Sequence, residues 1–143
     1  MPVRVKWCNS RVGLTVERFD HVVINCRDVD ATADWYERVL GMTRETFGES
    51  NRTALRFGEQ KINLRPIGAL ADDPEWATGS VEAAGSEDLC LITRATPGEV
   101  RAHLMACGVE IVAGPVTRTG ALGPMTSHYC RDLDGNLIEI AVY

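Results

Sequence analysis

Three residues of types that bind transition metals occupy positions expected to lie on β-strands. His21 belongs to the β-branched segment Phe19–Cys26, Asp88 opens a second such segment, and Glu139 interrupts the apolar run Leu137–Ala141. A carboxylate inside an apolar strand is costly unless it is paired or bound to a cation. A histidine with one or two carboxylates is a donor set for Zn²⁺, Mn²⁺, Fe²⁺, Co²⁺ or Ni²⁺. These three residues are therefore candidate ligands of a divalent metal.

Each candidate also has a purely structural interpretation. His21 would hydrogen-bond to backbone, Asp88 would cap the start of its strand, and Glu139 would face water at a sheet edge. The other two histidines, His103 on a predicted helix and His128 on the opposite face of its strand, are predicted to be non-catalytic.

Further polar side chains lie where they would contact a substrate. Asn63 and Arg65 are two residues apart on one predicted strand and so share a face. The guanidinium of Arg65 would bind an anionic substrate bidentately or would oppose a metal. Ser127 and Tyr129 alternate on another predicted strand, and Trp76, in a long loop, would stack on a planar ligand.

The elements that must position these residues occur twice along the chain. His21 to Gly41 spans twenty residues, and Asp88 to Gly108 spans twenty more, each interval with one helix ended by glycine, of which the first is amphipathic. The first helix begins after Asp28, and the second begins at a Thr96–Glu99 capping box. Strands are predicted at 19–26, 42–47, 52–57, 61–65, 88–93, 109–112, 125–131 and 136–142.

The repeat predicts an α+β fold of two tandem βαβββ modules, whose curled mixed sheets surround a cleft with the helices outside. Residues 1–16 form an N-terminal extension, and 17–143 form a single domain. Within it, module one spans 17–66, a linker spans 67–86 and module two spans 87–143. The linker is too long for an idle connection, which suggests that it covers a site or crosses between modules.

Composition excludes several functional classes. The 143 residues carry a net charge of −5 and no long apolar run, which argues against nucleic-acid partners and membrane spans. Five cysteines without a CxxC pair indicate reduced thiols in a cytoplasmic protein.

Several of these segments resemble the vicinal oxygen chelate superfamily, which includes glyoxalases, extradiol dioxygenases and bleomycin-binding proteins. The resemblance is carried by Phe19–Ile24, Trp35–Met42 and Asp132–Ile140 and covers residues 17–143. Within the superfamily, Phe57–Leu64 and Gly114–Pro124 are most similar to the subgroup of glyoxalase domain-containing protein 5 and bacterial virulence-type proteins. The second of these segments adds Arg118 as a substrate-binding candidate.

The resemblance assigns roles to individual positions. It implies that His21 is the first metal ligand and Glu139 the last, with Asp88 at a further ligand position and Tyr129 facing the site. Asn63 stands where glyoxalase I has a carboxylate, and Arg65 stands where the subgroup commonly has histidine. It also implies a homodimer in which His21 and Glu139 come from different subunits.

Two functions follow from these observations. The first is a metal-dependent lyase, isomerase or dioxygenase whose small, oxygen-rich and anionic substrate chelates the metal, with Tyr129 and Arg65 as catalytic residues and Glu45 or Glu49 as a general base. The alternative is a metal-free protein of the bleomycin-resistance type that binds a small molecule or antibiotic in the cleft.

Overall fold

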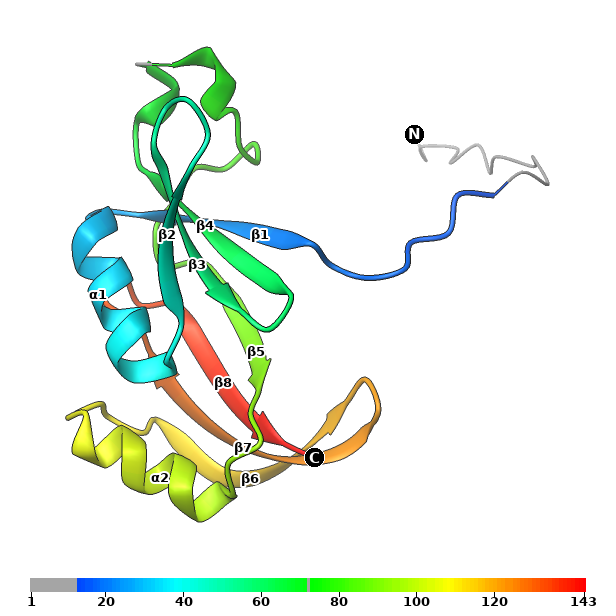
Figure 1. Ribbon diagram of the computed structural model, residues 1–143. Helices are drawn as coiled ribbons and strands as arrows, with labels where there is room; N and C mark the ends of the chain where they lie inside the picture. Colours follow the sequence, from blue (N-terminus) through cyan, green and yellow to red (C-terminus); the bar gives the residue numbers. More distant parts are fainter. Residues whose placement is uncertain (1–12, 72) are drawn as a thin grey trace, which may run out of the picture.

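The computed structural model describes residues 13–71 and 73–143 and contains two four-stranded mixed sheets, each covered by one helix (Figure 1). Module one contains β1 (His21–Cys26), α1 (Val29–Leu40), β2 (Thr43–Phe47), β3 (Arg52–Phe57) and β4 (Gln60–Pro66). Module two contains β5 (Asp88–Ile92), α2 (Pro97–Ala106), β6 (Ala113–Gly120), β7 (Gly123–Arg131) and β8 (Leu137–Val142).

The two sheets repeat the same strand order. Module one is ordered β1-β4-β3-β2 and module two β5-β8-β7-β6, and in each the first strand runs parallel to the last. The predicted α+β fold of two βαβββ modules is thereby confirmed. No helix among the described residues is long and apolar enough to cross a membrane.

The linker between β4 and β5 contains two short 3-10 helices, η1 (Ala69–Ala71) and η2 (Pro74–Trp76). Of the predicted N-terminal extension, residues 1–12 lie outside the described residues, and residues 13–16 have no regular secondary structure.

One predicted strand is wrong. Residues 109–112 form no strand, and β6 begins at Ala113. Val109 and Ile111 are apolar because they pack against the core beyond the end of α2, and a buried connection carries the same apolar signal as a strand.

Both helices begin and end where the sequence predicts. The Asp28 carboxylate accepts a hydrogen bond from the Ala31 amide at 2.9 Å, and Gly41 ends α1 with a left-handed φ of 64°. At α2, the Thr96 hydroxyl and the Glu99 carboxylate each accept a hydrogen bond from the other residue's backbone amide.

The helix-facing sides of both sheets share one apolar core. Ile24, Leu55 and Leu64 contribute from module one, and Leu104 and Ile138 from module two. This arrangement leaves the other face of each sheet uncovered by either helix. Val23 on β1 and Ile92 on β5 point to those faces and remain 43% and 56% exposed, respectively.

Candidate functional site

Strand alternation places the predicted site residues on the open face of each sheet. In module one, the core side chains Val22 and Ile24 alternate with His21, and Ile62 and Leu64 alternate with Asn63. In module two, Cys90 pairs with Glu139, which in turn pairs with Tyr129 on the neighbouring strand. The predicted face of every one of these residues is therefore observed.

His21 is held by its sequence neighbour. Its Nδ1 lies 2.7 Å from a carboxylate oxygen of Asp20, an arrangement that assigns the ring proton to Nδ1 and leaves Nε2 as an acceptor. The hydrogen bond with His21 lowers the pKa of the Asp20 carboxyl. Histidines that bind metals are oriented by such carboxylate partners. Asp20 was not among the residues predicted from the sequence, although its adjacency to His21 was the available signal.

His21 and Asp88 line the same cavity, although they begin the first strands of different modules. The cavity has a volume of about 280 Å³ and is bounded by Phe19, Lys61 and Cys90 among others. Both side chains are exposed to solvent. Two of the three predicted metal ligands therefore line one cavity, whose wall is formed by both modules.

Glu139 lies in a separate polar cluster on module two. The Ser127 hydroxyl donates to its Oε1 at 2.6 Å, and Arg118 Nε donates to the Tyr129 hydroxyl at 3.1 Å. Burial and the neighbouring Glu139 carboxylate raise the pKa of the Cys90 thiol to about 11. Burial and hydrogen bonding to Glu139 likewise raise the pKa of Tyr129, while Arg118 opposes that change.

The three predicted ligands do not meet within one chain. Among residues 13–71 and 73–143, no group of three or more histidine, cysteine, aspartate and glutamate side chains is placed to hold a metal ion. The donor atoms suit a divalent metal. His21 has Nε2 available, and the Glu139 carboxylate has one oxygen hydrogen-bonded to the Ser127 hydroxyl.

Arg65 is buried and engages the linker. Its guanidinium donates from Nε to the Trp76 carbonyl at 2.8 Å and from Nη1 to Asn25 Oδ1 at 2.9 Å and Glu82 Oε2 at 2.7 Å. Glu82 also accepts from the Gly68 amide, and these two interactions lower the pKa of its carboxyl. Bidentate binding of a substrate by Arg65 is restricted, because only Nη2 remains free of hydrogen bonds to the described residues.

Asn63, Arg65 and Trp76 line a second, smaller cavity of about 60 Å³ on the open face of module one. Strand register shows that Asn63 occupies the position in β4 that Glu139 occupies in β8. The linker therefore covers part of this face, through Trp76 and Glu82. Neither Asn25 nor Glu82 was predicted as a site residue, because their contacts with Arg65 cross between segments far apart in the sequence.

Of the two glutamates predicted as general bases, Glu45 is engaged by basic neighbours: its carboxylate lies 2.6 Å from Arg56 Nε and 3.9 Å from Lys61 Nζ. Glu49 lies in the turn between β2 and β3. His103 donates from Nε2 to the Val39 carbonyl at 2.8 Å, and His128 is buried on the helix side of β7.

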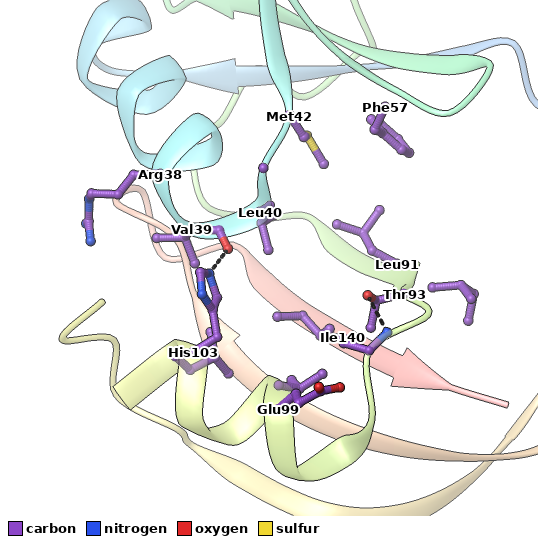
Figure 2. Close-up of a pocket in the computed structure, with 15 residues that line it drawn as sticks. Arg38, Val39, Leu40, Met42, Phe57, Leu91, Thr93, Glu99, His103 and Ile140 are labelled. Carbon is purple, nitrogen blue, oxygen red and sulfur yellow. Dashed lines mark hydrogen bonds between the residues drawn. The ribbon is translucent and has the colours of Figure 1, made fainter. Parts of the chain in front are cut away.

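An apolar pocket of about 340 Å³ lies between α1, α2 and β5 and contains none of the predicted site residues (Figure 2). Met42, Phe57, Leu91 and Ile140 contribute much of its wall, and the His103 ring at its edge is hydrogen-bonded to the Val39 carbonyl. With that ring engaged, the pocket offers few free polar groups to orient a reacting substrate.

Comparison with known proteins identifies relatives that cover most of the chain. The chain is 45% identical over 130 residues to the glyoxalase domain-containing protein RDO1 of Mycosarcoma maydis, covering 91% of this chain and 70% of that protein. It is 43% identical over 135 residues to virulence protein STM3117 of Salmonella typhimurium, covering 94% and 90%.

Solved structures show the same fold. The crystal structure of STM3117 matches with a TM-score of 0.84, covering 91% of this chain and 99% of that chain. A lactoylglutathione lyase from Agrobacterium tumefaciens matches with a TM-score of 0.66 at 17% identity, covering 90% and 95%, and so supports the fold alone.

The family model for the Glyoxalase/Bleomycin resistance protein/Dioxygenase superfamily matches residues 18–140. This range begins before β1, ends within β8 and contains all the candidate site residues described above. The chain belongs to the Glyoxalase/Bleomycin resistance protein/Dioxygenase superfamily.

Proposed function

We propose that this protein is a divalent-metal-dependent enzyme of the glyoxalase or dioxygenase type, acting on a small, oxygen-rich substrate. The observation that carries the proposal is the Asp20–His21 pair, which leaves the His21 Nε2 available in a cavity shared with Asp88. A superfamily that includes lyases and dioxygenases gives this donor arrangement a chemical context.

The metal would be held by His21, Asp88 and Glu139, with Glu139 supplied by a second copy of the chain. A homodimer would bring the three ligands together, since they form no metal-holding group among the described residues of one chain. A bound divalent metal supplies Lewis acidity toward a chelating substrate. The identity of the ion, Fe, Mn, Ni, Co or Zn, is for the experiment below to establish.

The chain's own residues would bind and orient the substrate around that centre. Tyr129, polarised between Arg118 and Glu139, is positioned to hydrogen-bond a substrate oxygen. Ser127 fixes one oxygen of Glu139 and thereby orients the carboxylate. Arg65, with Asn63 and Trp76, would hold an anionic part of the substrate.

A second candidate function is metal-free binding of a small molecule, as in bleomycin-resistance proteins. It is favoured by Asn63, an amide at the position where module two has the carboxylate of Glu139. An amide oxygen is a weaker ligand for a transition metal than a carboxylate.

Metal content decides between the two functions. Untagged protein purified without chelator should contain near-stoichiometric metal by mass spectrometry, and His21→Ala and Glu139→Gln should both lose it. His103→Ala is the matched control, because that ring contacts the Val39 carbonyl instead of the site, and it should retain the metal. If the wild type holds no metal even after reconstitution with several divalent ions, the enzyme proposal fails and the binding protein remains.

A further inference from the structure

Two of the residues that line the cavity under the linker each have a buried polar atom without a hydrogen-bond partner among the described residues. The cavity lies between β4 and η2 and has a volume of about 60 Å³, which suits one functional group of a ligand and not a whole molecule. Arg65 Nη2 and Asn63 Oδ1 are both buried, and neither has a hydrogen-bond partner among the residues that the structure describes. Buried polar groups are almost always satisfied, so the two atoms indicate a missing ligand or solvent.

The Arg65 side chain is held in one orientation in the wall of this cavity. Its side chain belongs to a residue only 2% exposed, and Nε and Nη1 are fixed by Trp76, Asn25 and Glu82. The three contacts hold the guanidinium plane and leave the two N–H groups of Nη2 for a ligand. A donor oriented in this way binds an anionic oxygen without having to lose side-chain freedom first.

The guanidinium donor left at the cavity favours a carboxylate oxygen as its partner. Two guanidiniums line the cavity, those of Arg65 and Arg52; the Glu82 carboxylate is paired with Arg65, and Arg52 also lines an adjoining cavity with Glu49 and Glu75. The Arg52 guanidinium lies 4.5 Å above the Trp76 ring and also donates to the Glu75 carbonyl. The charge of Arg65 is already paired, so the group still available at the cavity is Nη2, a charged donor from which a carboxylate oxygen would accept.

Asn63 adds a requirement for a second polar group beside the carboxylate. Its Oδ1 is an acceptor, so a ligand hydroxyl would donate to it. A hydroxyl also accepts hydrogen bonds, and so it would suit either orientation of the amide. A carboxylate with an adjacent hydroxyl matches both unpartnered atoms.

Strand register sets a minimum length for such a substrate. Asn25 pairs with Arg65 and His21 pairs with Lys61, four residues apart along β1. This separation is about 13 Å for extended backbone. A two-carbon acid is too short to contact both Arg65 and a metal held at His21.

We propose that the substrate is an elongated 2-hydroxy acid, whose carboxylate and hydroxyl bind Arg65 and Asn63 under the linker while the opposite end reaches His21. Only the part of this inference that concerns His21 rests on the proposed function. The binding site for the carboxylate and hydroxyl, called the acid pocket below, is inferred from Arg65 and Asn63 alone.

The pocket is tested on protein freed of metal by chelation. Acetate, glycolate and acetamide are titrated while the side-chain ¹H–¹⁵N signals of Arg65 Nε and Asn63 Nδ2 are followed by NMR. Acetate and glycolate should shift the Arg65 signal saturably, glycolate should bind several-fold more tightly than acetate, and neutral acetamide should bind more weakly than either.

Variants assign the binding to the two residues. Arg65→Gln with Glu82→Gln removes the ion pair as a whole and should weaken acetate binding about tenfold or more, the loss expected for a charge-assisted hydrogen bond. Arg56→Gln with Glu45→Gln is the matched control, because it removes another ion pair of the same face and should leave binding unchanged. Asn63→Ala should abolish the advantage of glycolate over acetate.

Absence of a saturable shift in the wild type, or equal affinity in the Arg65→Gln/Glu82→Gln variant, would overturn the pocket. If that variant does not fold, the comparison of glycolate with acetate in Asn63→Ala decides. The substrate length is tested by measuring the binding of 2-hydroxyoctanedioate to metal-loaded protein. The His21→Ala variant should bind this probe more weakly than the wild type does, while its affinity for glycolate should be unchanged. Equal affinity of both proteins for 2-hydroxyoctanedioate would overturn the elongated substrate. A protein that holds no metal but binds glycolate through Arg65 would contradict the proposed function and leave the acid pocket supported.

Discussion

At the scale of single residues, Asp132 joins the two modules through one carboxylate. Its Oδ2 accepts from the Tyr36 hydroxyl of α1 at 2.8 Å and from Asn136 Nδ2 at 2.7 Å. Its Oδ1 accepts from the backbone amides of Asp134 and Asn136. Burial, followed by the charge of Asp132, raises the pKa of Tyr36, so the phenol remains a donor at all ordinary pH values.

Tyr36→Phe is expected to destabilise the fold by about 1.5–3 kcal/mol, the contribution of a hydrogen bond to a charged group. Chemical denaturation monitored by circular dichroism measures this loss. Tyr143→Phe, at a half-exposed tyrosine, is the control and should cost less. A double-mutant cycle with Asp132→Asn should show a coupling energy, and additive effects would contradict the assigned bond.

His128 is the second residue whose environment predicts a measurable property. It is 1% exposed, and neither ring nitrogen has a partner among the described residues. Burial, with a smaller contribution from the charge of Arg101, lowers its pKa in the folded state. In the unfolded chain the pKa of this histidine is about 6.5, so the unfolded chain protonates His128 more readily than the folded chain does.

It follows that the neutral His128 supports stability above about pH 6.5 and that this contribution is lost as the pH falls toward the lowered folded pKa. His128→Phe should therefore flatten the decline in unfolding free energy between about pH 7.5 and pH 5. Urea denaturation of both proteins across this range is the measurement. Parallel curves for the wild type and the variant would show that His128 does not cause the decline.

At the scale of elements, the capping box of α2 is a local device that the sequence alone reveals. Thr96 and Glu99 satisfy each other's backbone amides, and the pattern needs no information from the rest of the fold. The low amphipathicity of α2, which buries only Val100 and Leu104, makes the helix more dependent on its cap.

Thr96→Ala is expected to cost about 0.5–2 kcal/mol of stability. Thermal or chemical unfolding gives the value, with Thr78→Ala as a control because Thr78 is an exposed linker residue. A loss no greater than that of the control would show that Pro97 and the core contacts of α2 are sufficient to start the helix.

The segment before β6 shows where element prediction fails. The segment 109–112 resembles a strand because its apolar residues Val109 and Ile111 cover the core, whereas the strand itself carries polar residues such as Thr117 and Arg118. One face of β6 is open to solvent, so its composition does not mark it as a strand. It is recognised only through its pairing with β7.

At the scale of the whole molecule, the arrangement of the modules predicts the assembly. Helices and core lie on one side of the sheets, and the open faces carry His21 and Glu139 at separate places. A second copy that brings module two of one chain to module one of the other would complete each site.

The protein is therefore expected to sediment as a homodimer. His21→Ala and Glu139→Gln, each unable to hold metal alone, should recover part of the metal content when unfolded together and refolded as mixed dimers. Each mixed dimer would contain one intact site and one site without either ligand. Sedimentation as a monomer, or no recovery beyond that of either variant refolded alone, would contradict a site shared between chains.

The sequence by itself determined the repeat, both helices with their caps and the strand face of the candidates on predicted strands, such as His21, Asn63 and Tyr129. These properties depend on spacing within a few residues, through the periods of strands and helices. It also identified His21 and Glu139 as unusual polar residues on otherwise apolar strands.

Only the tertiary structure decided which of these residues meet. It brings His21 and Asp88 into one cavity, leaves Glu139 with Ser127 and Tyr129, and fixes Arg65 through Glu82 of the linker. Such contacts join segments that are far apart in the chain, and their distances depend on how the two modules pack and not on any local period. The alternation of a strand shows which way a side chain points, and the packing of the modules determines what it faces.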